Sequence, residues 1–211
     1  SWVSNGISLR EISASAPLQN SAQNYFLDAK FCLVYSGTLG EANAVHTLIE
    51  AAAYLRDLDD CKILIIGQGR SQANLQARCS ELQLKNVKFI GYVPKNRIFS
   101  FLKNADATYI GFLKKPIYRF GVSPNKLFEY LVVGKPIIYG IDDVGVNPVT
   151  RYNAGLTVPA EDPEALADAI RTLYNTSEEN RRPMGENAHN AAVAHFTYEV
   201  LAKKMEKVLI P

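Results

Sequence analysis

Apolar residues along this chain fall into two alternating patterns from residue 31 onward. Short runs that are almost wholly apolar have the length of a strand, as expected for parallel strands covered on both faces. They span residues 31–36, 62–66, 87–90, 107–111, 136–140 and 156–158. Longer segments with helical spacing span residues 43–56, 71–83, 95–103, 124–133, 163–174, 177–194 and 198–209. Strand–helix units in series predict an α/β fold, a doubly wound parallel sheet of about six strands with helices on both faces.

Two of the predicted helices carry clear start signals. Asp162-Pro163 places a capping residue before a first-turn proline, and Ser123-Pro124 repeats that arrangement. We therefore expect Ser123 to be the N-cap, and Pro124 the first residue, of the helix over residues 124–133.

The chain has 211 residues, a length that fits one large domain. Residues 1–30 lack a sustained period and are rich in Ser, Ala and Asn, which is typical of a linker or an ordered surface extension. The pattern predicts a ligand-binding domain over residues 31–195 and a C-terminal helix within residues 196–211.

Composition and charge narrow the classes of function. The chain has 23 Lys and Arg residues against 21 Asp and Glu, and the basic residues are scattered, so no nucleic-acid partner is expected. No apolar run reaches the roughly 18 residues that a membrane span needs, and no signal peptide opens the sequence. Cys32, Cys61 and Cys79 have neither metal-site nor disulfide spacing. We expect three buried thiols and a cytoplasmic protein.

Ligands of open parallel sheets bind outside the carboxyl ends of the strands. After the first strand comes Gly37-Thr38-Leu39-Gly40, in which two glycines bracket a short connection to a helix. Such a turn lets backbone N–H groups approach an anion closely. It is not the dinucleotide fingerprint G-x-G-x-x-G, because position 42 is Ala. A tight strand-to-helix turn without a ligand remains the alternative.

The next two strand ends carry weaker signals. Gly67-Gln68-Gly69 follows the second strand and lacks the third glycine of the fingerprint, so a plain helix entry is the simpler interpretation. Tyr92 follows the third strand and could line a pocket for a flat base or cover the edge of the core. Neither segment decides the function alone.

The most informative stretch is the helix start that follows the long polar and aromatic loop after the fourth strand. Its free N–H donors and positive dipole end suit a diphosphate. Lys126 would add a mobile positive charge near phosphate, and Glu129 could accept hydrogen bonds from the two hydroxyls of a ribose. Asn125 and Lys126 precede Glu129 by four and three residues, so all three can share one edge of the helix. An ordinary amphipathic helix with a surface Lys–Glu pair is the alternative.

No other catalytic set is evident in the sequence. His46, His189 and His195 have neither metal spacing nor a nucleophile partner, and no metal site is expected. The sequence holds no P-loop, no nucleophile elbow and no paired catalytic carboxylates. The charged run at residues 177–182 is typical of a solvated helix start.

In their order along the chain, these segments resemble the C-terminal, donor-binding domain of the retaining GT-B glycosyltransferases of family 4, which is a Rossmann-like lobe. The resemblance spans nearly the whole chain. It rests on residues 3–7 (VSNGI), 35–40 (YSGTLG), 64–69 (LIIGQG), 87–93 (VKFIGYV), 123–129 (SPNKLFE) with 134–138 (GKPII), and 160–166 (AEDPEAL). Residues 31–195 are then the nucleotide-sugar-binding domain, and residues 1–30 include the interdomain linker.

The resemblance implies a UDP-sugar or another nucleotide diphosphate sugar as donor, with no further cofactor and no catalytic metal. It implies an acceptor held by an N-terminal domain outside this chain, and contact with the inner face of the membrane through that domain stays open. The Ser-Pro-Asn-Lys variant resembles transferases of bacterial polysaccharide and cell-envelope glycan synthesis, which often transfer an N-acetylated amino sugar. Lys126 and Glu129 are the residues expected to act in catalysis. The residues expected to contact the donor are Gly37, Thr38, Leu39, Gly40, Gly67, Gln68, Tyr92, Val93, Gly121, Ser123, Pro124, Asn125, Lys126, Leu127 and Glu129.

The sequence departs from the family pattern at two places. Glu129 matches the second glutamate of the family's paired-glutamate motif, whose first member falls on Gly121, or on Tyr118 in another alignment, so the first acid is absent. The basic residue that often follows the first glycine turn is also absent, since Glu41 and Asn43 stand there.

Three other functions stay open beside the transferase. The chain could be a non-catalytic binding or assembly subunit that kept the fold, or a nucleotide-sugar epimerase of the same architecture. A dehydrogenase is disfavoured because no G-x-G-x-x-G follows a strand. As a transferase lobe without its acceptor domain, the fragment is expected to be inactive alone.

Overall fold

The computed structural model describes residues 4–13, 15–18, 20–143 and 147–209. All strands of its sheet are parallel and lie in the order β3-β2-β1-β4-β5-β6. The strands are β1 (Phe31–Ser36), β2 (Cys61–Ile66), β3 (Val87–Gly91), β4 (Ala107–Gly111), β5 (Ile137–Gly140) and β6 (Gly155–Thr157). This order is the doubly wound arrangement, so the fold class predicted from the sequence is confirmed.

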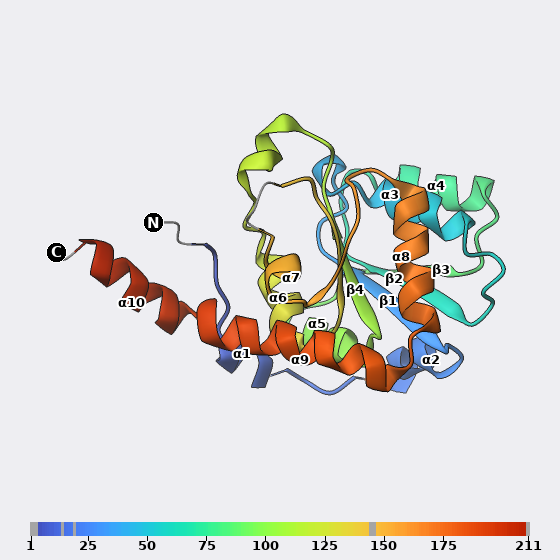
Figure 1. Ribbon diagram of the computed structural model, residues 1–211. Coiled ribbons are helices and arrows are strands. Elements are labelled where there is room, and N and C mark those ends of the chain that lie inside the picture. Colours follow the sequence, from blue (N-terminus) through green and yellow to red (C-terminus); the bar gives the residue numbers. More distant parts are fainter. Residues whose placement is uncertain (1–3, 14, 19, 144–146, 210–211) are drawn as a thin grey trace.

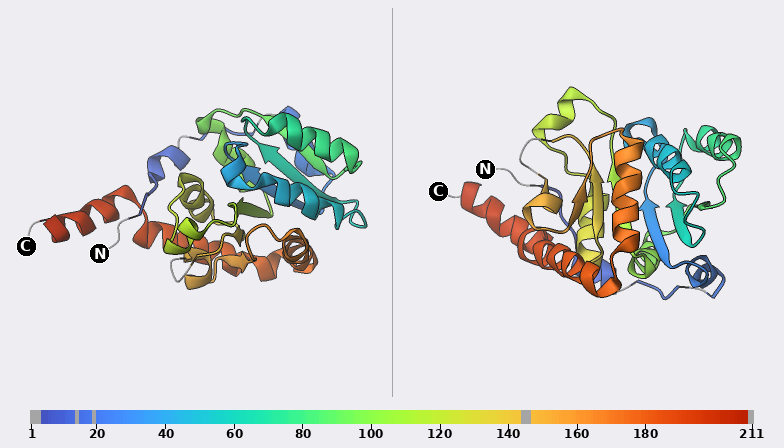
Figure 2. Two further views of the ribbon diagram at one scale, coloured as in Figure 1. Left: turned by 90° about the horizontal axis from the view of Figure 1, so that it is seen from above. Right: turned by 45° about the vertical axis from the view of Figure 1, so that its right-hand side comes forward.

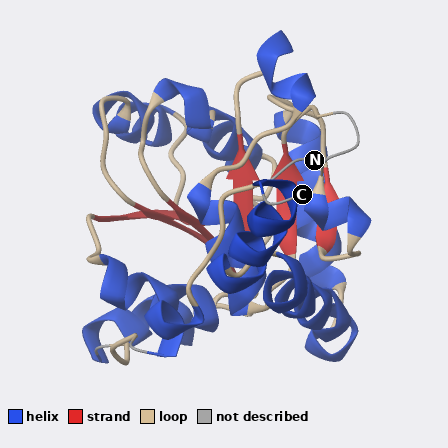
Figure 3. Ribbon diagram, turned by 90° about the vertical axis from the view of Figure 1, so that its left-hand side faces the viewer, coloured by secondary structure: helices blue, strands red, loops and turns tan. Residues whose placement is uncertain are grey.

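Helices cover both faces of the sheet, and its strands change direction across it as sheet twist requires (Figures 1 and 3). On one face lie α3 (Val45–Ala53), α4 (Gln72–Glu81) and α8 (Pro163–Asn175). On the other lie α5 (Lys95–Asn104), α6 (Asn125–Val133) and α9 (Glu178–His195). Successive strand residues point to opposite faces, so Val34 joins one core and Leu33 the other.

Two short segments differ from the sequence prediction. A helix was expected from residue 43, but residues 41–43 form the 3-10 turn η1 (Glu41–Asn43), and α3 begins only at Val45. Ala44 between them is left-handed, with φ 45°, and this breaks the helical path. The four-residue helix α7 (Pro148–Arg151), capped by the Asn147 side chain, is too short to show a period.

The segment before β1 contains two helices, α1 (Leu9–Ser13) and α2 (Asn20–Leu27). Phe26 of α2 packs on Phe101 of α5 with ring centroids 6.3 Å apart. Further upstream, the Ile7 N–H donates to the Phe196 carbonyl over 2.9 Å, at the end of α9. These N-terminal residues therefore pack along the body of the domain as an ordered extension. The division of the chain at residues 30 and 195 stays a prediction.

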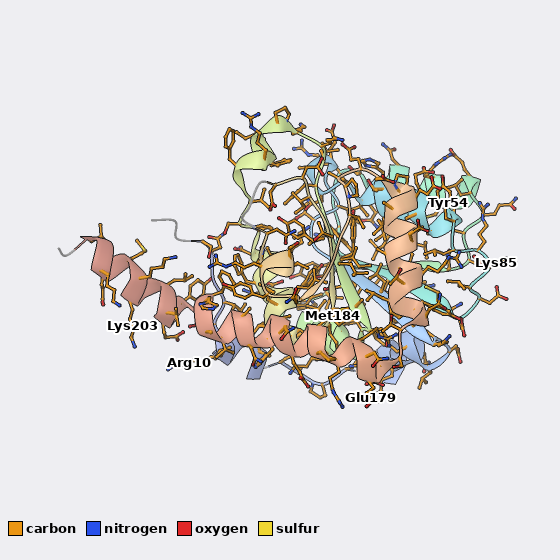
Figure 4. The ribbon with its side chains drawn as sticks, viewed as in Figure 1. Arg10, Tyr54, Lys85, Glu179, Met184 and Lys203 are labelled. Atoms are coloured by element: carbon orange, nitrogen blue, oxygen red, sulfur yellow. The ribbon has the colours of Figure 1, made fainter. Side chains whose placement is uncertain are left out.

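The last helix, α10 (Tyr198–Leu209), leaves the body and projects beyond it (Figures 1 and 2). Figure 4 places Lys203 on this projecting helix. Leu201 near its start is buried, whereas Met205 and Leu209 farther along are 47% and 71% exposed. Among the helices that the structure describes, none combines the length and the apolar character of a membrane span.

The cysteines follow the prediction only in part. Cys32 and Cys61 are buried, and burial raises the pKa of the Cys61 thiol to about 12. Cys79 is only half-buried, because α4 lies at the edge of its layer with Leu75 as its one buried residue among those described. The expectation of three buried thiols is therefore wrong for Cys79.

Arg181 corrects the expectation that residues 177–182 form a solvated helix start. Its side chain is only 9% exposed and donates to the Asp106 carboxylate over 2.6 Å. It also donates to the carbonyls of Leu173 and Thr176, each over 2.8 Å. Asp106 in turn accepts from the backbone N–H of Cys32 over 2.8 Å. The start of α9 is thus tied to the beginnings of β1 and β4.

Replacing Arg181 by Met is expected to lower the free energy of unfolding by about 3 kcal/mol, because it leaves the partner carboxylate without its counter-ion. Urea denaturation followed by circular dichroism measures the change. The matched control is Arg182→Met, since the Arg182 side chain is 67% exposed and pairs only loosely with Glu186 at 3.6 Å. Equal stability of the two variants would contradict a structural role for Arg181.

Candidate functional site

An open cleft of about 700 Å³ lies at the carboxyl ends of β1, β2 and β3, beside the start of α6. This is the edge of the sheet where ligands bind in open parallel folds. The cleft is lined by Ser36, Gly37, Thr38, Ile66, Gly67, Gln68, Gly69, Tyr92, Val93, Lys95, Ile98, Asn125, Lys126 and Glu129.

One wall of the cleft is made by two glycine turns, residues 37–40 and 67–69, that contact each other through their backbones. Gly67 has φ 139°, and a Cβ atom there would lie 1.9 Å from the Gly37 carbonyl oxygen. The Gly37 N–H donates to the Ile66 carbonyl over 2.9 Å, and the Leu39 N–H donates to the Gln68 carbonyl over 3.0 Å. These two amides hold the turns together and are therefore not donors to a ligand.

Lys126 reaches from the first turn of α6 to the first glycine turn. Its Nζ donates to the Asn43 Oδ1 over 2.5 Å and to the Tyr35 hydroxyl over 3.0 Å. It also lies 4.6 Å from the ring centroid of Tyr35 and 5.8 Å from that of Phe112. Burial lowers the pKa of Lys126 to about 7, and the negative charge of Glu129 only partly opposes this.

A buried tyrosine fixes α6 against the end of β1. The Tyr130 hydroxyl accepts from the Ser36 N–H over 2.8 Å and donates to the Ser36 carbonyl over 3.1 Å. Burial raises the pKa of Tyr130, so its hydroxyl stays protonated and able to donate. The sequence analysis did not single out Tyr130, although this residue directly follows Glu129 in the chain. Its side chain lies on the apolar face of the helix.

The start of α6 differs by one residue from the prediction. Pro124 is the N-cap, with φ −74° and ψ 137°, and Asn125 is the first helical residue, so the assignment of Ser123 as N-cap is wrong. The Ser123 hydroxyl instead accepts from the Asn5 N–H over 2.7 Å, and the Asn5 side chain donates to the Ser123 carbonyl over 2.6 Å. The upstream segment thus uses the group that would have capped the helix.

The structure brings most of the predicted site residues together. Those that line the cleft are Gly37, Thr38, Gly67, Gln68, Tyr92, Val93, Asn125, Lys126 and Glu129. Leu39 and Leu127 are buried in the two cores instead. Gly40, Gly121, Ser123 and Pro124 lie outside the lining residues.

The cleft also has residues that the sequence analysis did not name. Lys95, the first residue of α5, brings a second lysine to the lining. It lies four residues after the end of β3, and this position just beyond Pro94 is the sequence signal that points to it. None of His46, His189 and His195 lines this cleft, and His46 contacts the Glu161 carboxylate at 3.2 Å.

Comparison with known proteins gives concordant matches. Residues 19–191 match the family described as Glycosyl transferases group 1. D-rhamnosyltransferase WbpZ of Pseudomonas aeruginosa is 29% identical over 157 residues, which are 74% of this chain and 39% of that protein. Anabaena Alr3699/HepE in complex with UDP-glucose has the same fold, with a TM-score of 0.74 at 18% identity over 96% of this chain and 53% of that one. WaaG, a glycosyltransferase involved in lipopolysaccharide biosynthesis, also has this fold. Its TM-score is 0.74 at 19% identity, and the match covers 99% of this chain and 56% of that one.

The chain spans between 35% and 44% of the lengths of the curated relatives that it matches. The family match contains the two glycine turns and α6, which form the cleft. The chain belongs to the family of glycosyl transferases group 1 and has the fold of the C-terminal, donor-binding lobe of GT-B glycosyltransferases.

Proposed function

We propose that this chain is the nucleotide-sugar-binding lobe of a retaining glycosyltransferase and that its donor is a UDP-sugar. The observation that carries the proposal is the meeting of a glycine turn, Lys126 and Glu129 in one open cleft. A lysine beside a helix start suits a diphosphate, and a carboxylate suits the paired hydroxyls of a ribose. UDP is favoured over other nucleotides because the matching Anabaena structure holds UDP-glucose.

The lining residues suggest an orientation for the donor. Tyr92 at the end of β3 is 67% exposed, so its ring offers a flat surface for the base. Glu129, one helical turn beyond Asn125 on α6, also lines the cleft and would bind the ribose. The diphosphate would then lie against Lys126 and the first turn of α6, with Thr38 and Asn125 facing phosphate or sugar.

The transfer step places new negative charge beside Lys126 and the start of α6. The bond between the anomeric carbon and the diphosphate oxygen breaks, and the sugar forms a bond to the oxygen of an acceptor hydroxyl, whose proton passes to the departing diphosphate. Negative charge grows on the departing diphosphate, where Lys126 and the dipole of α6 would stabilise it. The acceptor would be held by a domain outside this chain. Glycan synthesis in the bacterial envelope is favoured by the match to WaaG, which is involved in lipopolysaccharide biosynthesis.

A non-catalytic nucleotide-sugar-binding subunit is the second candidate, and one observation favours it. Gly121, where one of the two alignments puts the first glutamate of the paired motif, has φ 98° and ψ 157°. Only glycine adopts this region readily, so an acidic residue there would be strained. The sugar must then be held by other groups, or transfer must have been lost. An epimerase is less favoured, since no histidine lines the cleft.

UDP is expected to raise the melting temperature of the chain more than GDP or ADP at the same concentration. Binding to the folded state alone stabilises it by RT ln(1 + [L]/Kd), which is about 2.7 kcal/mol at one hundred times Kd. A thermal-shift series with the three nucleotides and their sugars measures this. A series in which no nucleotide shifts the transition would exclude a donor site in this lobe.

Replacing Glu129 by Ala is expected to weaken UDP binding by about 1–3 kcal/mol, the usual loss when charged hydrogen bonds are removed. Isothermal titration calorimetry measures the affinity. Glu206→Ala is the matched control, because Glu206 is exposed on the projecting helix α10. An unchanged affinity for the Glu129 variant would refute the ribose role.

The isolated chain is expected to bind UDP-sugar without transferring the sugar, because the acceptor site would lie in another domain. Incubation with UDP-sugar and candidate acceptors, followed by assay of released UDP and of glycosylated product, checks this. Product formed by the chain alone at enzymatic turnover would show that both sites lie within it.

A further inference from the structure

We infer that Asn43 and the Tyr35 hydroxyl are positioning residues that hold the Lys126 ammonium against the first glycine turn, ready for a diphosphate. The inference deepens the proposed function, on which its ligand depends. It assigns roles to two residues that the sequence analysis did not place in the site.

The two hydrogen-bond partners of the Lys126 ammonium are uncharged. An ammonium has three N–H donors, and two of them are directed at the Asn43 amide oxygen and the Tyr35 hydroxyl oxygen. Neither acceptor neutralises the charge, as a carboxylate would. The third donor is then available for a phosphate oxygen in the cleft that Lys126 lines.

The position of the ammonium is fixed by backbone as well as by side chains. A Cβ atom on Gly37 would lie 3.1 Å from the Lys126 Nζ, so the ammonium lies directly on the turn. Asn43 is held in place by η1, whose Asn43 N–H donates to the Gly40 carbonyl over 3.1 Å. The Tyr35 hydroxyl donates in turn to the Thr38 carbonyl over 2.9 Å.

This arrangement keeps a long side chain in one place before the ligand arrives. A free lysine loses rotamer freedom when it binds a phosphate, and a lysine already held by neighbours loses less. Because the holding groups are neutral, the positive charge remains available to the diphosphate. An aspartate at position 43 would hold the ammonium equally well but would compete with the ligand for its charge.

The arrangement also links diphosphate binding to pH. The groups around the ammonium are Glu129 on α6, Tyr35 on β1, Asn43 in η1 and Phe112 after β4, and Glu129 is the one carboxylate among them. Burial holds the pKa of Lys126 at about 7 in the free protein. A bound diphosphate favours the charged form and raises this pKa. Binding therefore takes up a proton above pH 7, and affinity falls as pH rises.

Two measurements on the whole chain test the inference, with Asn43→Asp as the main variant because it keeps the size of the side chain. The first is the NMR titration of Lys126 without ligand. Asn43→Asp is expected to raise the pKa of Lys126 by at least one unit, since it adds a negative charge at hydrogen-bond distance. Asn43→Leu and Tyr35→Phe are expected to lower it, because each removes an acceptor for the charged form.

The second measurement is UDP affinity by calorimetry between pH 7 and 8.5, where the charge of UDP changes little because its second phosphate pKa is near 6 and the uracil ring ionises only at higher pH. For the wild-type chain, affinity is expected to fall by up to about tenfold per pH unit, the limit for uptake of one proton. Asn43→Asp is expected to bind UDP about tenfold more weakly at pH 7 and to show this slope only at higher pH, above its raised Lys126 pKa. Lys126→Met should bind weakly with no slope.

The outcomes separate the inference from the proposed function. A Lys126 titration that none of the three variants moves would overturn the positioning roles, whatever the UDP result. A wild-type chain that binds no UDP would overturn the proposed donor site, and the ligand-free titration would still decide whether Asn43 and Tyr35 hold the ammonium. Thermal unfolding of each variant shows whether it is folded. Tyr35→Phe alters a buried side chain, and if that variant does not fold, the Asn43→Asp titration alone decides the test.

Discussion

The backbone contact between the two glycine turns determines where the cleft can form. β1 and β2 run in register to their last residues, with Ser36 opposite Ile66, so both turns leave the sheet at the same level. A Cβ atom would lie 1.9 Å from the Gly37 oxygen if placed on Gly67, and 2.4 Å from the Leu39 oxygen if placed on Gly69. Any side chain at either position would push the turns apart. The register of β1 and β2 therefore also determines the position of the cleft wall.

The electrostatics of the cleft depend on this wall, because Lys126 lies on it. Tyr130 fixes α6 to the end of β1 through Ser36, and Lys126 on the same helix then reaches the first turn. A lysine held largely away from water by neutral groups destabilises the free protein relative to one exposed to solvent. With the proposed function, a diphosphate would relieve that cost when it binds. Part of the unfavourable energy of the site would then be released only in the presence of an anion.

Much of the fold was predictable, and the failures have physical causes. β1 and β4 begin and end at the predicted residues, since strands buried on both faces are marked by apolar residues alone. α1 and α7, with five and four residues, are too short to show a helical period. The burial of Arg181 and the use of Ser123 by Asn5 depend on partners 75 and 118 residues away. No local pattern reports such contacts.

The site shows the same division between local and distant information. Residues at strand ends and on the first turn of α6 could be named from spacing, because each faces the cleft by its own position in the fold. Asn43 could not, because its role depends on where a lysine 83 residues later places its Nζ. The resemblance leads one to expect a basic residue after the first glycine turn, where Glu41 and Asn43 stand in this chain. In the structure the cation arrives from α6 and uses the Asn43 oxygen as an acceptor. A second cation at position 43 would repel Lys126, so the absence of one and the presence of the other belong together. In this chain the cation beside the turn therefore comes from α6.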